Sequence, residues 1–99
     1  MKIYILKIIS SLVRIRLKFF SNSKISIHPS AILHWSIKIK GPGKIIIGAN
    51  CNLWSFEEPN RFLTYEKNAT IEIKENNRIN GATFHCREKI TIEPDCLIG

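Results

Sequence analysis

The stretch Ile45-Ile46-Ile47-Gly48-Ala49-Asn50-Cys51 decides the fold of this chain, because it is one of four copies of a single pattern. The pattern is Ile-x-Ile, two further residues, a Ser, Asn or Asp, and then a small or polar residue. The other copies begin at Ile25, Ile71 and Ile90. Six residues after the second Ile of each copy stands an aliphatic residue, and these four residues are Leu33, Leu53, Ile79 and Ile98.

The spacing of the copies predicts a triangular β-solenoid. They start 20, 26 and 19 residues apart, whereas a coil with three six-residue sides needs about eighteen residues, so each coil carries a small insertion. Gly41-Pro42-Gly43 fits a tight turn in the first coil, and Phe56-Glu57-Glu58-Pro59-Asn60 fits a longer loop that leaves one corner of the second. An ordinary mixed-β domain with short Ile-rich strands would not explain why the residue six positions after the second Ile is aliphatic in all four copies.

Each side of the coil is expected to be a short strand with one aliphatic residue pointing inward, stacked in parallel on the coil before it. A second inward position, four residues later at the corner, accepts only a small or hydrogen-bonding group. These corner residues are Ala31, Cys51, Asn77 and Cys96. The Asn or Asp just before the corner suits a left-handed backbone. A further step of six predicts that Ile39 and His85 also face inward, with His85 partly buried and hydrogen-bonded.

Composition supports one domain and gives little indication of a nucleic-acid-binding or disulfide-bonded protein. The chain has 99 residues, of which 19 are Ile, 7 are Leu and 1 is Val, and this Ile-rich usage favours strands. The net charge of +7 is concentrated in residues 1–20, which hold five basic residues and no acidic one, so the body gives little support for nucleic-acid binding. Three cysteines without a C-x-x-C pair indicate free, buried or half-buried thiols in a reducing compartment.

Residues 1–20 predict an amphipathic helix that precedes the repeat region, residues 25–99. Its polar stripe is Lys7, Ser11, Arg14 and Lys18, and its apolar face is Ile5, Ile8, Ile9, Leu12, Ile15 and Phe19. Lys7 and Arg14 interrupt the apolar run, which disfavours both a transmembrane span and a signal peptide. Two interpretations remain, namely that the apolar face packs on the following domain or that it lies on an anionic membrane. Ser21-Asn22-Ser23 is expected to break the helix.

The repeat resembles that of hexapeptide-repeat acyltransferases. Ile47-Gly48-Ala49-Asn50-Cys51-Asn52 and Ile92-Glu93-Pro94-Asp95-Cys96-Leu97 carry the resemblance, which covers residues 25–99. Together with the basic leader, the coil at Gly43–Gly48 looks like those of capsular or exopolysaccharide O-acetyltransferases. The resemblance implies an all-β, left-handed parallel β-helix of about four coils, the last incomplete. It also implies a homotrimer, acetyl-CoA as the acetyl donor, and a sugar or polysaccharide-precursor hydroxyl as the acceptor, in a cytoplasmic protein with or without membrane association.

The resemblance places few site residues on this chain. In such enzymes a general-base His follows a Cys-Leu-Ile-Gly-like coil, and because Cys96-Leu97-Ile98-Gly99 stands last here, that His is expected beyond Gly99 and the chain is expected to have little activity alone. His85 is the fallback base. Asn80 is the candidate acceptor-site residue by resemblance to maltose and galactoside acetyltransferases, and its alternative role is a turn asparagine.

No metal site is expected, because the coil spacing keeps His28, His34 and His85 from converging on one ion. The alternative function is a non-catalytic β-solenoid that serves as an oligomerisation or membrane-surface module. The missing catalytic segment and the basic leader would explain such a role.

Overall fold

The structure, a computed structural model, describes residues 2–20, 24–55 and 57–98. It consists of helix α1 (Lys2–Phe20) followed by eleven strands in the described residues. The strands are β1 (Lys24–Ile27), β2 (Ile32–Leu33), β3 (Lys38–Lys40), β4 (Lys44–Ile47), β5 (Asn52–Leu53), β6 (Arg61–Thr64), β7 (Thr70–Ile73), β8 (Arg78–Ile79), β9 (Thr83–Cys86), β10 (Lys89–Ile92) and β11 (Leu97–Ile98). The predicted break at Ser21-Asn22-Ser23 lies outside the described residues.

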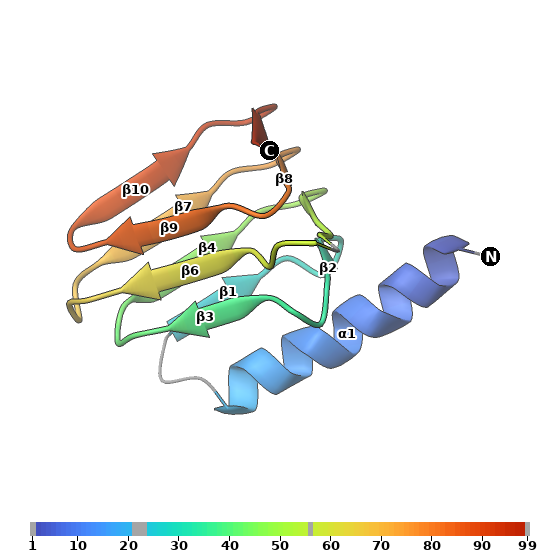
Figure 1. Cartoon of the computed structure of the whole chain (residues 1–99), viewed down its shortest axis with the longest axis horizontal. Helices are drawn as coiled ribbons and strands as arrows, with labels where there is room; N and C mark the ends of the chain where they lie inside the picture. The colour runs from blue at the N-terminus through green and yellow to red at the C-terminus, as the bar shows by residue number, and fades with distance from the viewer. Residues whose placement is uncertain (1, 21–23, 56, 99) are drawn as a thin grey trace.

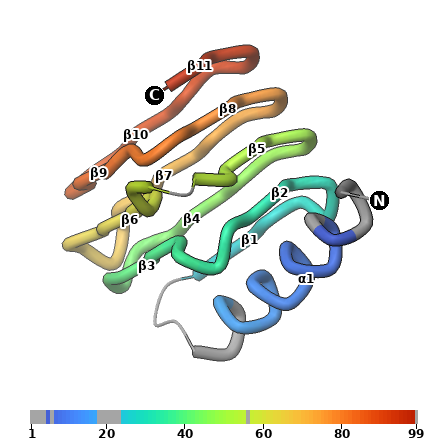
Figure 2. Tube along the Cα trace, turned by 45° about the vertical axis from the view of Figure 1, so that its right-hand side comes forward, coloured from blue at the N-terminus to red at the C-terminus, as the bar shows by residue number. Residues whose placement is uncertain are grey.

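The strands form three parallel sheets that make the sides of a solenoid (Figures 1 and 2). Their orders are β1-β4-β7-β10, β2-β5-β8-β11 and β3-β6-β9, so each of the first three coils gives one strand to each sheet and the last coil gives β10 and β11. In the first sheet Lys24 pairs with Lys44, Lys44 with Thr70, and Thr70 with Lys89. This register confirms the predicted coil spacings and the predicted β-solenoid of about four coils. The left-handed winding stays a prediction of the resemblance.

Ladders of apolar side chains fill the interior, one along each sheet. In the second sheet Leu33, Leu53 and Ile79 are all fully buried, and Ile98 of the last coil is half-buried. This confirms the inward aliphatic position predicted six residues after the second Ile of each copy. In the third sheet Phe62 stacks on Phe84 with ring centroids 5.2 Å apart. Burial of such rows is the main stabilising term in a solenoid, because each coil covers the apolar face of its neighbour.

The corners confirm the second set of predicted inward positions. Ala31, Cys51 and Asn77 are buried, and Cys96 is half-buried. The residues just before three of these corners have left-handed backbones, with φ of 58° at Asn50, 59° at Asn76 and 64° at Asp95. Asn and Asp tolerate this region better than other side chains, which is why they stand there.

The extra residues of the second coil are divided between two places. Relative to the first coil, the registers add three residues between β5 and β6 and three between β6 and β7. The predicted loop at residues 56–60 is therefore confirmed, but it accounts for only half of the insertion. Phe56 lies outside the described residues. The turn at 66–69 supplies the rest. In the first coil the predicted tight turn is confirmed, since Gly41 has a φ of 107° and the Gly43 N–H donates to Thr64 Oγ1 at 2.8 Å.

The prediction that His85 faces inward is wrong. Phe84 takes the inward place, because it pairs with the buried Phe62 and lies five rather than six residues after Ile79. The corner between β8 and β9 is one residue shorter than in the first coil, and Gly81 at a φ of 71° makes that shortening possible. Because successive side chains in a strand alternate, the missing residue turns His85 outward, where it is exposed.

Helix α1 packs on the first coil, but not with the face that the sequence predicted. Among the helix residues whose burial is described, Ser10, Val13 and Leu17 are buried. Of the predicted apolar face, Ile9 is half-buried against the core, four members are exposed, and the side chain of Phe19 lies outside the described part of the chain. These exposed residues are Ile5, Ile8, Leu12 and Ile15.

The reason for this choice of face lies in the first coil, which leaves backbone groups that need hydrogen bonds. The Leu33 N–H donates to Ser10 Oγ at 2.8 Å, and the Arg14 and Arg16 guanidinium groups donate to the carbonyls of Pro29 and Ile37. A purely apolar face could not satisfy these groups. No helix among the described residues is long and apolar enough to cross a membrane.

Candidate functional site

His85 is the first candidate site residue, and it lies on the outer face of the third sheet. Tyr65, which directly follows β6, places its hydroxyl 2.5 Å from His85 Nδ1. The two rings are stacked, with centroids 5.9 Å apart, and both residues are exposed. The β6–β9 pairing creates this contact between residues twenty positions apart.

This geometry suits proton transfer at the second ring nitrogen of His85. When Nδ1 donates its hydrogen to Tyr65 Oη, the lone pair of Nε2 is left to accept a proton, and the tyrosine fixes the plane of the ring. A base held by a third group in this way is the usual arrangement for activating a hydroxyl. Tyr65 was missed in the sequence because nothing local marks it as a partner of His85.

Asn80 is exposed, and it lies at the corner between β8 and β9. Its backbone N–H donates to the Ile98 carbonyl at 2.8 Å, which ties the corner to the last coil. The corner position fits a turn asparagine, and its role in binding an acceptor stays a prediction. His85 lies beyond this corner, within β9 itself.

His28 and His34 occupy successive corners and share one local motif, in which the backbone N–H of the second following residue donates to Nδ1. The donors are Ser30 and Ser36, each at 3.1 Å. His28 is exposed. Because its Nδ1 accepts a hydrogen bond from the Ser30 N–H, the hydrogen of the neutral ring is on Nε2. His34 is buried beside Trp35 and Trp54, and burial lowers its pKa.

Histidines, cysteines and acids do not gather into a metal site: within residues 2–20, 24–55 and 57–98 no three of them could hold an ion. The three thiols are free, as the sequence indicated. Cys51 donates to the Lys74 carbonyl at 3.1 Å, and burial raises the pKa of its thiol, so it is poorly suited to be a nucleophile.

A basic groove between α1 and the first corner was not anticipated from the sequence. It encloses about 600 Å³, and its polar lining includes Lys7, Ser11, Arg14, His28 and Asn50. The helix and the repeat region each contribute residues to the groove, so no local sequence motif could predict it. Among the described residues that line it there is no Asp or Glu, which makes it a candidate site for an anion.

Comparisons of this chain with protein-family models, with curated proteins and with solved structures found no significant match. The resemblance to hexapeptide-repeat acyltransferases therefore rests on the repeat residues of the chain itself and on the parallel β-solenoid that they form.

Proposed function

We propose that this chain forms the solenoid of an acyltransferase, which moves an acetyl group from acetyl-CoA to a sugar hydroxyl during the synthesis of a surface polysaccharide. The observation that carries the proposal is the outward-facing His85 with Nδ1 held by Tyr65. It supports the proposal because O-acetyl transfer needs a base next to an accessible surface on which a sugar can lie.

The reaction follows from the position of this base. Nε2 of His85 takes the proton of the sugar hydroxyl as the hydroxyl oxygen attacks the thioester carbonyl. The tetrahedral intermediate then collapses, the carbon–sulfur bond breaks, and the proton on Nε2 passes to the leaving CoA thiolate. The products are an O-acetyl sugar and CoA, and His85 returns to its starting state.

Acetyl-CoA and a panel of oligosaccharides are the reagents that test this proposal, with CoA release and acetylated product measured together. Since His85 is only the fallback base of the family pattern, we expect slow transfer by the 99-residue chain. General-base catalysis contributes about 10²-fold or more, so His85→Gln should reduce even this slow transfer to the background rate. His28→Gln is the matched control, because it removes another exposed His without touching the third sheet.

Two results would contradict the proposal. The first is the absence of acetylated product with every acceptor. The second is transfer that is equally fast in His85→Gln, which would show that another group is the base.

A non-catalytic module is the second candidate function, and the exposed apolar residues of α1 favour it. Ile5, Ile8, Leu12 and Ile15 are each more than half exposed, and such a surface is typical of a docking site. A solenoid that lacks transfer activity but assembles or binds membranes through α1 would fit this candidate.

A further inference from the structure

We propose that α1 docks this protein on the surface of a bilayer that contains anionic phospholipids. The inference makes the second candidate function specific by naming the membrane and the residues that bind it, and it does not depend on acetyl transfer. It begins with an apolar row on the exposed side of α1, formed by Ile5, Ile8, Leu12 and Ile15, whose exposed fractions are 56%, 60%, 62% and 54%. Their spacing of three, four and three residues places them on one helix face. The buried Ser10, Val13 and Leu17 point elsewhere, so the contact with the first coil leaves this row uncovered.

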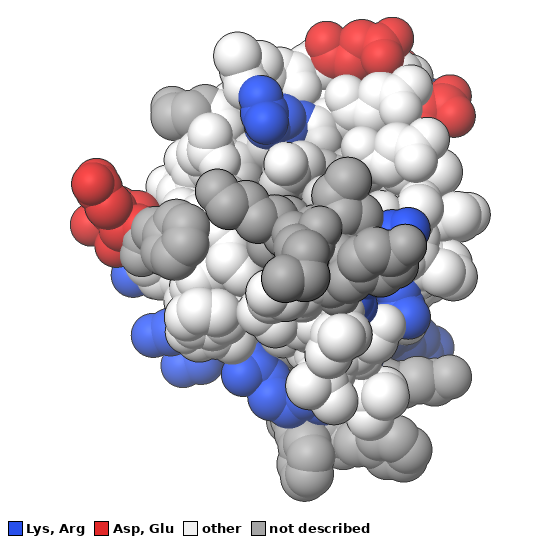
Figure 3. Space-filling view, turned by 90° about the vertical axis from the view of Figure 1, so that its right-hand side faces the viewer, with Lys and Arg blue, Asp and Glu red and all other residues white. Residues whose placement is uncertain are grey.

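The charges around the apolar row select an anionic partner. At 3.6 residues per turn, Arg16 lies along one side of the row, and Lys7 and Arg14 lie along the other. Residues 1–20 hold five basic residues and no acidic one. Lys and Arg gather over α1 and the first coil in the lower half of Figure 3, while Asp and Glu lie above them. Two copies of this face would repel each other, whereas an anionic membrane surface would attract it.

The basic groove lies beside the apolar row and suits a lipid phosphate. Lys7 and Arg14 contribute two cationic groups, and His28 contributes an Nε2–H because its Nδ1 accepts the Ser30 N–H. With the apolar row at the depth of the acyl chains, these groups would lie at the depth of the headgroups. Arginine and ammonium groups bind phosphate oxygens by charge-assisted hydrogen bonds.

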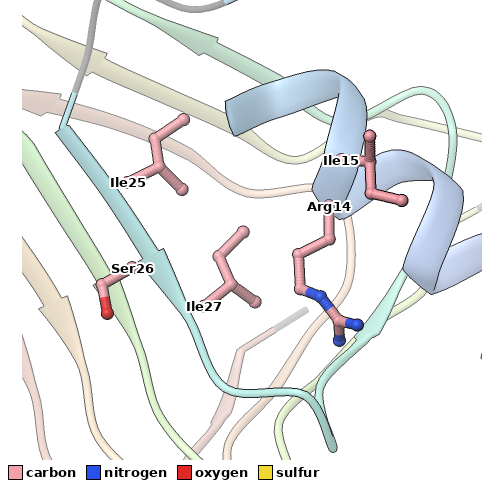
Figure 4. A pocket seen from close by; sticks show the side chains of 5 residues that line it. All are labelled: Arg14, Ile15, Ile25, Ser26 and Ile27. Carbon is pink, nitrogen blue, oxygen red and sulfur yellow. The ribbon is translucent and has the colours of Figure 1, made fainter. Parts of the chain in front are cut away.

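A second recess, lined by polar as well as apolar residues, lies on the same side of the helix. It encloses about 350 Å³ between α1 and β1, and Ile15 of the apolar row is one of its lining residues. Ile25 and Ile27 point from β1 toward α1, while Ser26 points away (Figure 4). Both isoleucines are only half-buried. Arg14 lines both the recess and the basic groove. The three isoleucines of the recess therefore lie next to the cationic groups of the groove, an arrangement that suits the acyl chain and the phosphate of a phospholipid.

Vesicle flotation of the full 99-residue chain tests the proposal. We expect binding to phosphatidylcholine vesicles that contain phosphatidylserine, and at least tenfold weaker binding to vesicles of phosphatidylcholine alone. The reason is that each Lys or Arg near an anionic surface raises the partition coefficient by a factor of about five. Substitution is preferable to deletion of α1, because deletion would also expose the first coil.

Two matched pairs of variants separate the apolar and the charged contributions. Leu12→Ser should lower the partition coefficient about tenfold, while Leu97→Ser, which removes an even more exposed leucine from the last coil, should leave it unchanged. Lys7→Glu should lower the partition coefficient about thirtyfold. Lys67→Glu, which changes the net charge by the same amount but lies on the β6–β7 turn, should change the partition coefficient by less than about twofold.

Three outcomes would overturn the proposal. One is equal binding to neutral and anionic vesicles, or no binding to either. Another is that Leu12→Ser leaves flotation unchanged but lowers the molar mass in light scattering, because a second copy would then be the occupant of the apolar row. A third is that inorganic phosphate binds the free protein while Lys7→Glu leaves flotation unchanged, because the groove would then be a site for free phosphate and would take no part in membrane binding.

Discussion

Replacing Asn60 by Ala should be among the most damaging single changes in this protein. Asn60 is buried at the end of the β5–β6 connection, and its side chain bridges two coils. Nδ2 donates to the carbonyls of Leu53 at 2.9 Å and Ile79 at 3.0 Å, and Oδ1 accepts from the Ala82 N–H at 3.0 Å. Asn60→Ala leaves these three backbone groups without their partner. A buried group left unsatisfied costs about 1–3 kcal/mol, and partial entry of water keeps the total near the lower end, at about 3–5 kcal/mol.

Urea unfolding followed by tryptophan fluorescence measures this loss, with Trp54 close in sequence to the altered loop. At a slope of about 1–3 kcal/mol per molar urea, the midpoint should fall by more than about 1 M. Asn68→Ala is the control, because Asn68 is exposed and its replacement should change stability by less than about 0.5 kcal/mol. A loss below about 1 kcal/mol for Asn60→Ala would refute the reasoning that this side chain joins the two coils.

Three further predictions concern the turn, the buried histidine and the thiols. Gly41→Ala should destabilise the protein by about 1–3 kcal/mol in the same urea assay, because Gly41 has a φ of 107° and a Cβ there would overlap the Thr64 carbonyl. Burial lowers the pKa of His34, so below pH about 6.5 the unfolded chain binds more protons than the folded chain. Stability should therefore fall as the pH drops through this value, and His34→Gln should flatten the dependence in urea midpoints measured across the pH range. Iodoacetamide should modify the half-buried Cys96 before Cys51, whose thiol is buried and has a raised pKa, as peptide mass spectrometry of the native protein would show.

The coil could be predicted from the sequence because its signals are local and repeated. The left-handed Asn50 and Asn76 each stand just before a buried corner residue, and the aliphatic residue follows at a fixed distance. These signals depend only on neighbours within a few positions and on the stacking of coils that repeat the same pattern. The same logic failed at His85, since one residue fewer at the Gly81 corner reverses which side chain faces inward. A fixed step of six cannot detect such a local shortening.

The face of α1 could not be predicted from its hydrophobic pattern alone. That pattern selects the row containing Leu12, while the structure buries Ser10 and Val13 instead. The choice depends on backbone groups of the first coil, such as the Leu33 N–H, that need a hydrogen-bond partner. The Tyr65–His85 contact could not be predicted either, because it also depends on a contact between distant parts of the chain, the pairing of β6 with β9.

Disulfide cross-linking of neighbouring coils tests the parallel solenoid most directly. Glu72 of β7 and Thr91 of β10 are register partners with outward-facing side chains. Adjacent strands lie about 4.8 Å apart, which is within the range of about 4.4–6.8 Å between Cα atoms that a disulfide spans. The doubly substituted chain Glu72→Cys/Thr91→Cys should therefore form this disulfide on mild oxidation, as mapped by mass spectrometry. The pair Glu72→Cys/Glu93→Cys, at a diagonal of about 8 Å, should not. Preferential linkage of the second pair, or equal linkage of both, would contradict the parallel register on which the fold rests.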